Sequence, residues 1–163
     1  MSKIIKDGSL VADDWHLFTK ECEIPAADAI GSRSIVPMSF WLENREVLKS
    51  KNQLGVWIDS DEDVEAIAED IHTLPLLAVN FPGFMDGRAF STARIVRDRY
   101  EFKGELRAIG GFIRDQLTYL KRCGVNAFQS DSLDLEVAVA SLNDFSESYQ
   151  AACDQPKPLF LRR

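Results

Sequence analysis

The sequence has few of the residues that most redox and metal sites need. Its three cysteines, Cys22, Cys123 and Cys153, are isolated from one another, and no CxxC pair occurs. An iron–sulfur cluster usually needs four thiolates at characteristic spacings, so these three indicate reduced cytosolic thiols instead. The two histidines, His16 and His72, are scattered, which argues against a histidine-based metal site. We therefore expect no metal and no cofactor held by the chain.

Long apolar runs and an excess of positive charge are also missing. No run approaches the roughly 20 apolar residues that a membrane-spanning helix needs. The opening segment MSKIIKDGSL has no apolar stretch typical of a signal peptide, so we expect a cytoplasmic protein without a membrane partner. The formal net charge is −7 and the pI is near 4.9. Polyphosphate repels such a chain, which argues against nucleic acid as a partner.

The glycine motifs of nucleotide-binding proteins are absent as well. The sequence contains no GxxxxGK[ST] phosphate loop, and no GxGxxG opens a helical segment. The sequence therefore has no glycine motif that would support a flavin or nicotinamide oxidoreductase. Ser91 has no histidine within its stretch, which argues against a hydrolytic triad.

What the sequence does have is a regular alternation of short apolar strands and helical patterns. Strands are predicted to start near residues 34, 54, 76, 106 and 126. Helical patterns follow them at 41–51, around 64–71, and at 87–99, 112–123 and 133–153. This alternation predicts an α/β fold of about five βα units with a mainly parallel sheet, either an open layer or an incomplete TIM-like barrel.

The two ends of the chain are expected to differ from this repeat. Residues 1–33 read as an irregular entry with a short hairpin whose turn is Asp7–Gly8. Residues 154–163 contain two prolines and should be extended. At 163 residues, with no linker that would divide it, the chain is predicted to form a single domain over residues 1–163.

Basic residues gather in the stretch from Phe84 to Arg122. Nine of the 19 lysines and arginines lie there against five acidic residues. The stretch therefore carries about +4, whereas the remainder of the chain carries about −11. Such asymmetry predicts that anions or acidic partners meet the protein here.

Three loops are expected at the carboxyl ends of the strands, where parallel α/β proteins place their ligands. They cover residues 59–61, 80–88 and 110–111. Gly87 at a helix entrance would free backbone N–H groups for an anion, and Arg88 would add a fork of donors.

Two interpretations of these basic residues stay open. In the first, they build an oxyanion or partner-binding pocket, with Asp115 as the only obvious proton carrier. Its candidate residues are Asp86, Gly87, Arg88, Ser91, Arg94, Arg107 and Gln116. In the second, Arg88, Arg94 and Arg107 form a structural salt-bridge network with Asp86, Glu105 and Asp115. Arg107 lies within a predicted strand, where a charge must be paired or must face a cleft.

Several spaced motifs in the second half of the chain occur in a fixed order. They are Phe81–Pro82, Asp86–Gly87–Arg88, Phe90–Ser91, Ala93–Arg94, Gly104–Glu105–Leu106–Arg107–Ala108, Gly110, Arg114–Asp115–Gln116–Leu117, Arg122–Cys123–Gly124, Pro158–Leu159–Phe160 and Arg162–Arg163. Together they resemble the motifs of an uncharacterised bacterial family, domain of unknown function 934. Two departures matter: Gly111 stands where the family often has an acidic residue, and Val125 stands where an aromatic residue is common.

The resemblance implies a pathway. Members are labelled as oxidoreductases of sulfite reduction, a label that rests on gene neighbourhood beside the assimilatory sulfite reductase. This chain lacks the cysteine array of a sirohaem and iron–sulfur reductase, so it does not resemble that catalyst. The resemblance therefore favours a non-catalytic accessory protein that docks to sulfite reductase or its electron donor.

Two other hypotheses stay open beside that one. A small enzyme or sensor would act on an oxyanion such as sulfite, sulfate or a nucleotide sulfate. An oxidoreductase of the same pathway is the other. Exposed aromatic residues make a homodimer a further prediction.

Overall fold

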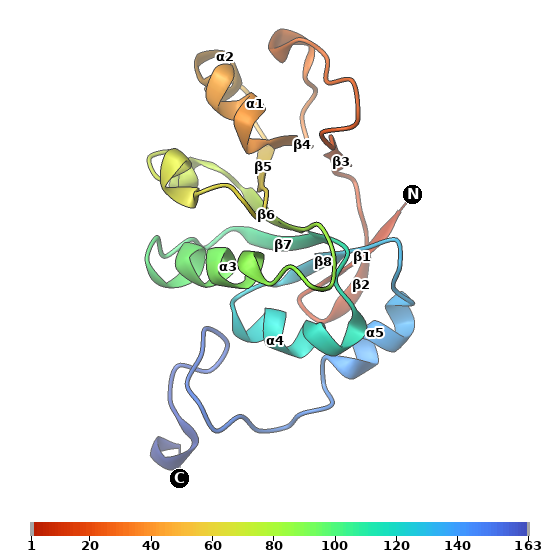
Figure 1. The fold of residues 1–163 in the computed structure, drawn as a ribbon, viewed down its shortest axis with the longest axis vertical. Coiled ribbons are helices and arrows are strands. Elements are labelled where there is room, and N and C mark those ends of the chain that lie inside the picture. The colour runs from red at the N-terminus through yellow and green to blue at the C-terminus, as the bar shows by residue number, and fades with distance from the viewer. Residues whose placement is uncertain (1, 163) are drawn as a thin grey trace.

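The computed structural model describes residues 2–162, so Met1 and Arg163 lie outside the described residues. Its centre is one eight-stranded sheet in the order β2-β1-β8-β7-β6-β5-β4-β3 (Figure 1). The strands are β1 (Lys3–Lys6), β2 (Ser9–Ala12), β3 (His16–Leu17), β4 (Ser34–Pro37), β5 (Leu54–Ile58), β6 (Leu76–Phe81), β7 (Glu105–Gly110) and β8 (Ala127–Gln129).

The five strands expected from the apolar runs are confirmed as β4 to β8. They pair in chain order and in parallel, and β3 adds a sixth parallel strand at the β4 edge. The predicted N-terminal hairpin is present as β1 and β2. Because β1 pairs with β8 in the antiparallel sense, the sheet is mixed and not purely parallel. No expectation covered β3, since a strand of two residues leaves no periodic signal.

The sheet is curled into a half-barrel. A flat sheet of eight strands about 4.8 Å apart would place its edge strands roughly 34 Å from each other. Only residues 13–15 connect β2 at one edge with β3 at the other. The four steps from Ala12 to His16 span at most about 14 Å. The edges must therefore approach each other, which decides between the two predicted architectures in favour of the incomplete barrel.

Alternate residues of each strand serve the two faces of the curled sheet. The outer face carries the main core, in which Val56, Val79 and Ala108 pack together with residues from the helices. The inner face carries a smaller cluster made by Ile35, Trp57, Leu76, Ala78 and Ile109, against which Trp15 and Leu17 pack. This two-sided burial explains why the strands read as continuous apolar runs.

The helices are shorter than the sequence patterns predict. They are α1 (Met38–Glu43), α2 (Arg45–Lys49), α3 (Arg88–Asp98), α4 (Leu117–Arg122) and α5 (Leu135–Ser141). The prediction of a helix around 64–71 is wrong, because that segment forms the 3-10 turns Val64–Ile67 and Ile71–Thr73. None of the helices in residues 2–162 has the length and apolarity to cross a membrane.

The long helix predicted over 133–153 ends at Ser141 instead. Beyond it the chain turns back alongside α4 and runs toward the C-terminus (Figure 1). Phe145 and Tyr149 continue the apolar spacing of that predicted helix, but both are exposed. The predicted extended tail also contains the 3-10 turn Leu159–Leu161.

Candidate functional site

The three loops expected to form a site do meet. Residues of all three line one cavity of about 610 Å³ at the carboxyl ends of the strands, here called the mouth cavity. The loop residues at the cavity are Asp59, Asn80, Phe81, Pro82, Gly110 and Gly111. The sequence did not point to the residues after β3 and β8 that complete the lining, among them Lys20, Ser130 and Ser132. The position of Ser130 directly after the fifth predicted strand was a signal that could have found it.

A charged pair forms part of the mouth cavity. The Lys20 ammonium donates to Asp59 Oδ2 at 2.6 Å and lies 5.4 Å from the Trp57 ring centroid. Asn80 Nδ2 donates to Asp59 Oδ1 at 2.9 Å. Burial opposes ionisation of Asp59, but the hydrogen bonds from Lys20, Asn80 and the Ser60 N–H outweigh it and lower the pKa of Asp59. Asp59 is therefore held as a carboxylate.

The charges at the mouth do not favour an anion. Among residues 2–162, Lys20 is the single basic residue that lines it, and Glu21, Asp59 and Asp131 are acidic. The hydrogen bond to Asp59 raises the pKa of Lys20, so its ammonium stays charged but is already engaged. An oxyanion entering here would meet more negative than positive charge.

The loop from Pro82 to Arg88 forms the outer edge of this end of the molecule. Ser60 Oγ donates to Asp86 Oδ2 at 2.8 Å, and Arg88 Nη2 donates to Ser60 Oγ at 3.0 Å. Arg88 also donates to Asp86 through Nε at 3.0 Å and Nη2 at 2.6 Å. The hydrogen bonds from Arg88 and Ser60 hold the pKa of Asp86 far below its usual range. Asp86 and Arg88 thus fix the loop to the turn that follows β5.

A second contact fixes the same loop to the start of α4. Gln116 Nε2 donates to the Phe84 carbonyl at 3.5 Å, and Gln116 Oε1 accepts from the Ile113 N–H at 3.1 Å. The loop is therefore braced from two sides, yet Met85 is 89% exposed and Phe84 is 51% exposed. We call Phe84, Met85, Arg88 and Ile113 the rim patch.

Arg88 keeps binding capacity in this arrangement. Its Nε and Nη2 are engaged by Asp86 and Ser60, while Nη1 makes no hydrogen bond with residues 2–162. The side chain of Arg88 is 61% exposed. Through Nη1, this guanidinium can still donate hydrogen bonds to an acidic group of another molecule.

The remaining predicted site residues lie elsewhere. Ser91 and Arg94 line a small cavity of about 290 Å³ between α3 and α4, together with Phe90 and Tyr119. Arg94 pairs with Asp98 one turn further along the helix. The chain therefore does not bring Arg88, Ser91 and Arg107 into one pocket.

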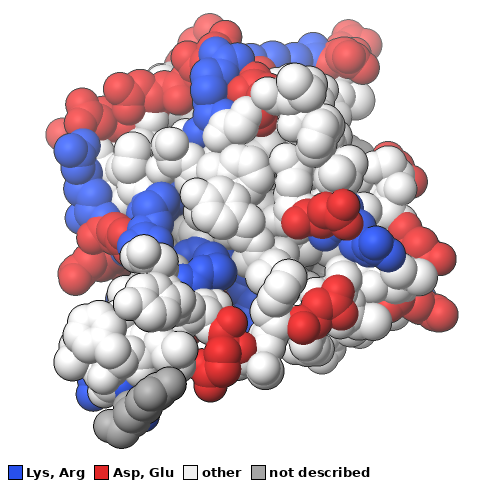
Figure 2. Space-filling model, turned by 60° about the horizontal axis from the view of Figure 1, so that its bottom comes forward, with Lys and Arg blue, Asp and Glu red and all other residues white. Residues whose placement is uncertain are grey.

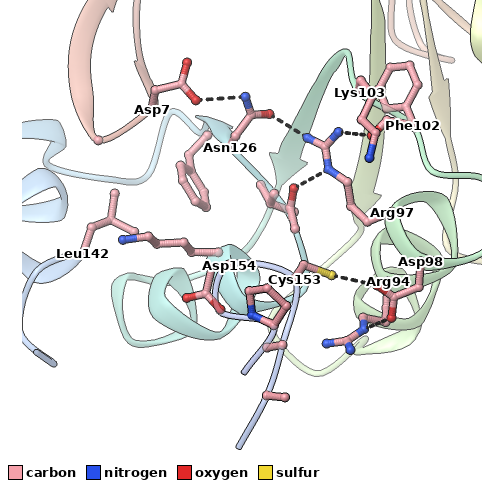
Figure 3. A pocket seen from close by; sticks show the side chains of 18 of the residues that line it. Asp7, Arg94, Arg97, Asp98, Phe102, Lys103, Asn126, Leu142, Cys153 and Asp154 are labelled. Atoms are coloured by element: carbon pink, nitrogen blue, oxygen red, sulfur yellow. Dashed lines mark hydrogen bonds and ion pairs between the residues drawn. The ribbon is translucent and has the colours of Figure 1, made fainter. Parts of the chain in front are cut away.

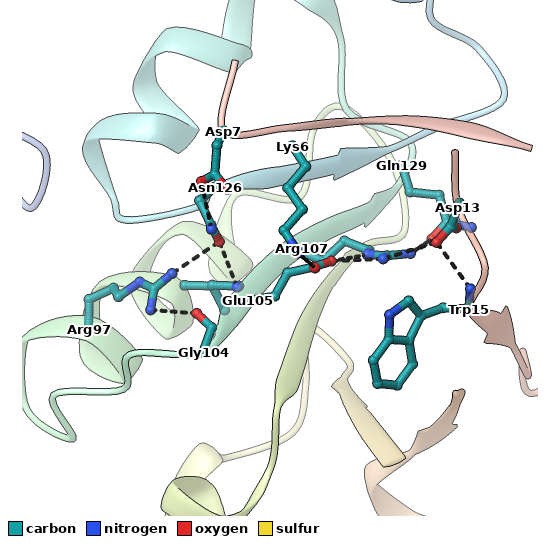
Figure 4. A network of polar contacts seen from close by, with 11 residues as sticks. Lys6, Asp7, Asp13, Trp15, Arg97, Gly104, Glu105, Arg107, Asn126 and Gln129 are labelled. Atoms are coloured by element: carbon teal, nitrogen blue, oxygen red, sulfur yellow. Dashed lines mark hydrogen bonds and ion pairs between the residues drawn. The ribbon is translucent and has the colours of Figure 1, made fainter. Parts of the chain in front are cut away.

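Arg107 lies on the inner face of the curled sheet and is 1% exposed (Figure 4). Its guanidinium contacts Glu105 at 2.7 Å, Asp13 at 3.0 Å and Gln129 at 2.8 Å. Lys6 adds a second cation, 2.7 Å from the other oxygen of Glu105. Ala78 and Ala127 stand level with Arg107 on the neighbouring strands, and their small side chains leave room for the long one.

These contacts settle the alternative of a salt-bridge network for two of its three arginines. Arg88 pairs with Asp86 and Arg107 pairs with Glu105, as expected. Arg94 pairs with Asp98 and not with Asp115. Asp115 is an exposed carboxylate on the turn before α4, 3.5 Å from Arg114, and is not among the residues that line the mouth.

Metal binding finds no ready-made site here. Among residues 2–162, no three His, Cys, Asp or Glu side chains come together in a way that could hold a metal ion. The carboxyl end of the sheet thus offers a polar cavity and an apolar rim.

Comparison with known proteins gives one match. Residues 55–160 match the model of a family described as bacterial proteins of unknown function, DUF934. The match begins in β5 and contains the whole rim patch, whereas Lys20 and Asp13 lie outside it. No curated protein and no solved structure matches the chain.

Proposed function

Because the chain belongs to the bacterial family DUF934, we propose from its rim patch that it is an accessory protein, which docks onto another protein. The observation that carries the proposal is the outward display of Phe84 and Met85 on a braced loop beside Arg88. Aromatic residues, methionine and arginine are the residue types enriched at protein interfaces.

The bracing supports docking because it lowers the entropic cost of association. Ordering a flexible loop on binding subtracts from affinity, about 0.5–1.5 kcal/mol for each immobilised side chain. Here Ser60 and Gln116 already hold the loop from both sides. A partner would gain the burial of Phe84 and Met85 without first ordering their backbone.

The rim patch also defines the chemistry of its partner. Phe84, Met85 and Ile113 would pack into an apolar depression on the partner's surface. The open Nη1 of Arg88 would pair with an acidic group at the edge of that depression. The resemblance described above names the first candidates, which are assimilatory sulfite reductase and the protein that donates electrons to it. That assignment, like the label of oxidoreductase, is a proposal supported by the resemblance alone.

A direct binding measurement tests the proposal. Purified sulfite reductase and its electron donor are immobilised in turn, and binding is measured by biolayer interferometry for wild type and Phe84→Ala. Truncating an aromatic anchor costs about 2 kcal/mol or more, so the affinity should fall at least about 30-fold. Phe145→Ala is the matched control, since Phe145 is exposed on the C-terminal segment away from the rim.

Two outcomes would count against the proposal. One is equal binding by Phe84→Ala and wild type. The other is a wild-type dimer in sedimentation equilibrium that Met85→Asp dissociates, since the rim patch would then join two copies of this chain, as the predicted homodimer requires.

A further inference from the structure

A second cavity, larger than the mouth cavity, lies away from the mouth, and no residue of the rim patch lines it. It has a volume of about 970 Å³. Four parts of the chain enclose it: α3, the segment before β7, the end of α4, and the C-terminal segment, with the hairpin turn at Asp7 and Gly8 closing one side (Figure 3). Figure 2 shows basic side chains within a hollow on the face that carries the C-terminal segment. We call it the tail cavity.

Arg97 is the fixed cation of the tail cavity. Its Nε donates to the Gly124 carbonyl at 2.8 Å, and its Nη1 donates to the carbonyls of Phe102 at 2.5 Å and Gly104 at 3.0 Å. Its Nη2 donates to Asn126 Oδ1 at 3.1 Å. All four partners are neutral oxygens, and within residues 2–162 no carboxylate forms an ion pair with Arg97.

This environment leaves a positive charge uncompensated. Burial lowers the pKa of Arg97, but a guanidinium stays protonated in proteins. Four of its five N–H groups are engaged, so the group is rigid, and one N–H of Nη2 has no partner among the described residues. A partly buried, preorganised cation without a counter-ion attracts an anion from solvent.

Two lysines add to this charge. Lys103 and Lys121 line the tail cavity and form no ion pair among residues 2–162. Two of the three acidic lining residues are already paired, Asp98 with Arg94 and Asp154 with Arg122. Asp7 is the third, and its carboxylate accepts from Asn126 Nδ2 at 3.0 Å.

The thiol at the cavity does not offset the positive charge. Burial, aided by a hydrogen bond to Asp98, raises the pKa of Cys153 to about 11. Cys153 is therefore neutral at physiological pH. Three cations thus face one unpaired carboxylate, in a chain whose net charge is −7.

We propose that the tail cavity binds a small organic anion whose phosphate or sulfate group lies against Arg97, with Lys103 and Lys121 on the cavity wall adding to the positive charge that attracts it. The volume exceeds what an inorganic ion needs and falls within the range of small-molecule sites, about 300–1,000 Å³. Phe102, Phe128, Leu142 and Pro156 supply apolar wall for the body of the ligand. This site replaces the anion pocket expected around Arg88, Ser91 and Arg107, and it is independent of docking at the rim.

Calorimetric titration tests this assignment with four probes. Phenyl phosphate and phenyl sulfate carry both required parts, inorganic phosphate lacks the organic body, and benzyl alcohol lacks the charge. We expect both phenyl esters to bind more tightly than inorganic phosphate, and benzyl alcohol to show no binding. Raising the salt concentration should weaken the binding of the esters.

Three charge variants should change the affinity for phenyl phosphate in opposite directions. Lys103→Gln and Lys121→Gln should each weaken phenyl phosphate binding about fivefold, and Asp7→Asn should strengthen it by a similar factor. Lys3→Gln is the matched control, because Lys3 is exposed and does not line the cavity. Circular dichroism confirms that each variant is folded.

The assignment is overturned if neither ester binds to wild type. It is also overturned if folded Lys103→Gln and Lys121→Gln bind phenyl phosphate as tightly as Lys3→Gln does. Neither result would affect the rim patch, whose residues are not part of the tail cavity.

Discussion

At the scale of single residues, the buried charges of this protein stabilise its fold, whereas the exposed ones are available for recognition. The side chains of Arg107 and Asp13 are each 1% exposed and join β7 to the chain segment that crosses the inner face. Arg88, by contrast, keeps an open nitrogen at the surface. The two arginines belong to the same basic stretch, but their surroundings give them different roles.

Removing the Arg107 guanidinium should destabilise the protein strongly. Arg107→Met leaves Asp13 buried without its cation, and breaking a buried pair in this way costs about 3–5 kcal/mol. Adding Asp13→Asn to Arg107→Met should recover part of the loss, because the unpaired charge is then gone. Urea unfolding measures both variants. A single variant as stable as wild type would show that the network does not stabilise the fold.

Asp70 should make stability depend on acid. It is buried, accepts hydrogen bonds from Trp41 Nε1 at 2.9 Å and Arg45 Nε at 2.7 Å, and forms an ion pair with Lys49 Nζ at 2.8 Å. Burial opposes its ionisation, but these donors outweigh burial and lower the pKa of Asp70 in the folded state. The unfolded chain titrates near 3.9. The stabilisation is therefore complete above about pH 4 and is lost as the pH falls through the folded pKa.

The comparison with Asp70→Asn isolates this effect. At pH 6 the variant should be less stable than wild type by about 2 kcal/mol, since charge-assisted hydrogen bonds are lost. The difference should shrink as the pH falls below about 4, because the unfolded wild-type chain then binds a proton at Asp70 that the folded chain does not yet bind. Thermal unfolding from pH 6 to pH 3 measures it, and a constant difference across that range would contradict the role assigned to Asp70.

The pairing of charged residues could be predicted from the sequence only where the two partners lie close together along the chain. The need for Arg107 to be paired followed from its place in a strand, and Glu105 lies two residues away. Its other partner, Asp13, lies 94 residues away. That pairing requires the segment after β2 to cross the inner face, which no local pattern reports. The same holds for Lys20 and Asp59, which lie 39 residues apart.

At the scale of elements, the strands were predictable and the helices only partly so. A strand that is buried on both faces has a continuous run of apolar residues, as in β5 and β6, and such a run is easily recognised in a sequence. The segment after Ser141 has helical spacing through Phe145 and Tyr149, but both side chains are exposed. An apolar stripe at helical spacing forms a stable helix only where the rest of the protein provides a surface that buries the stripe. Whether such a surface exists depends on the tertiary fold.

The end of β7 depends on a residue without a side chain. Gly110 has φ +94°, and a Cβ there would lie 2.4 Å from the Phe81 carbonyl oxygen. Gly110→Ala should therefore cost at least about 2 kcal/mol, combining backbone strain and overlap. Gly31→Ala is the control, because a Cβ there has no neighbour within 4 Å and φ is unstrained. Equal stability of the two variants in urea would contradict this account of the turn.

At the scale of the whole molecule, two cavities differ in their charge. Among residues 2–162, more acidic than basic residues line the mouth cavity, whereas three cations without an ion pair line the tail cavity. Strand count left the choice between an open layer and an incomplete barrel undecided. The short connection from β2 to β3 and the pairing of β1 with β8 decide it, and both depend on contacts between distant parts of the chain.

Photocrosslinking from position 85 tests most directly whether the rim patch contacts another protein. A photoreactive phenylalanine analogue replaces Met85 in the native host, and the same analogue replaces Phe145 as the control. The account predicts a crosslink from position 85 to sulfite reductase or its electron donor, absent from position 145. Position 85 giving no product, or the same products as position 145, would contradict it.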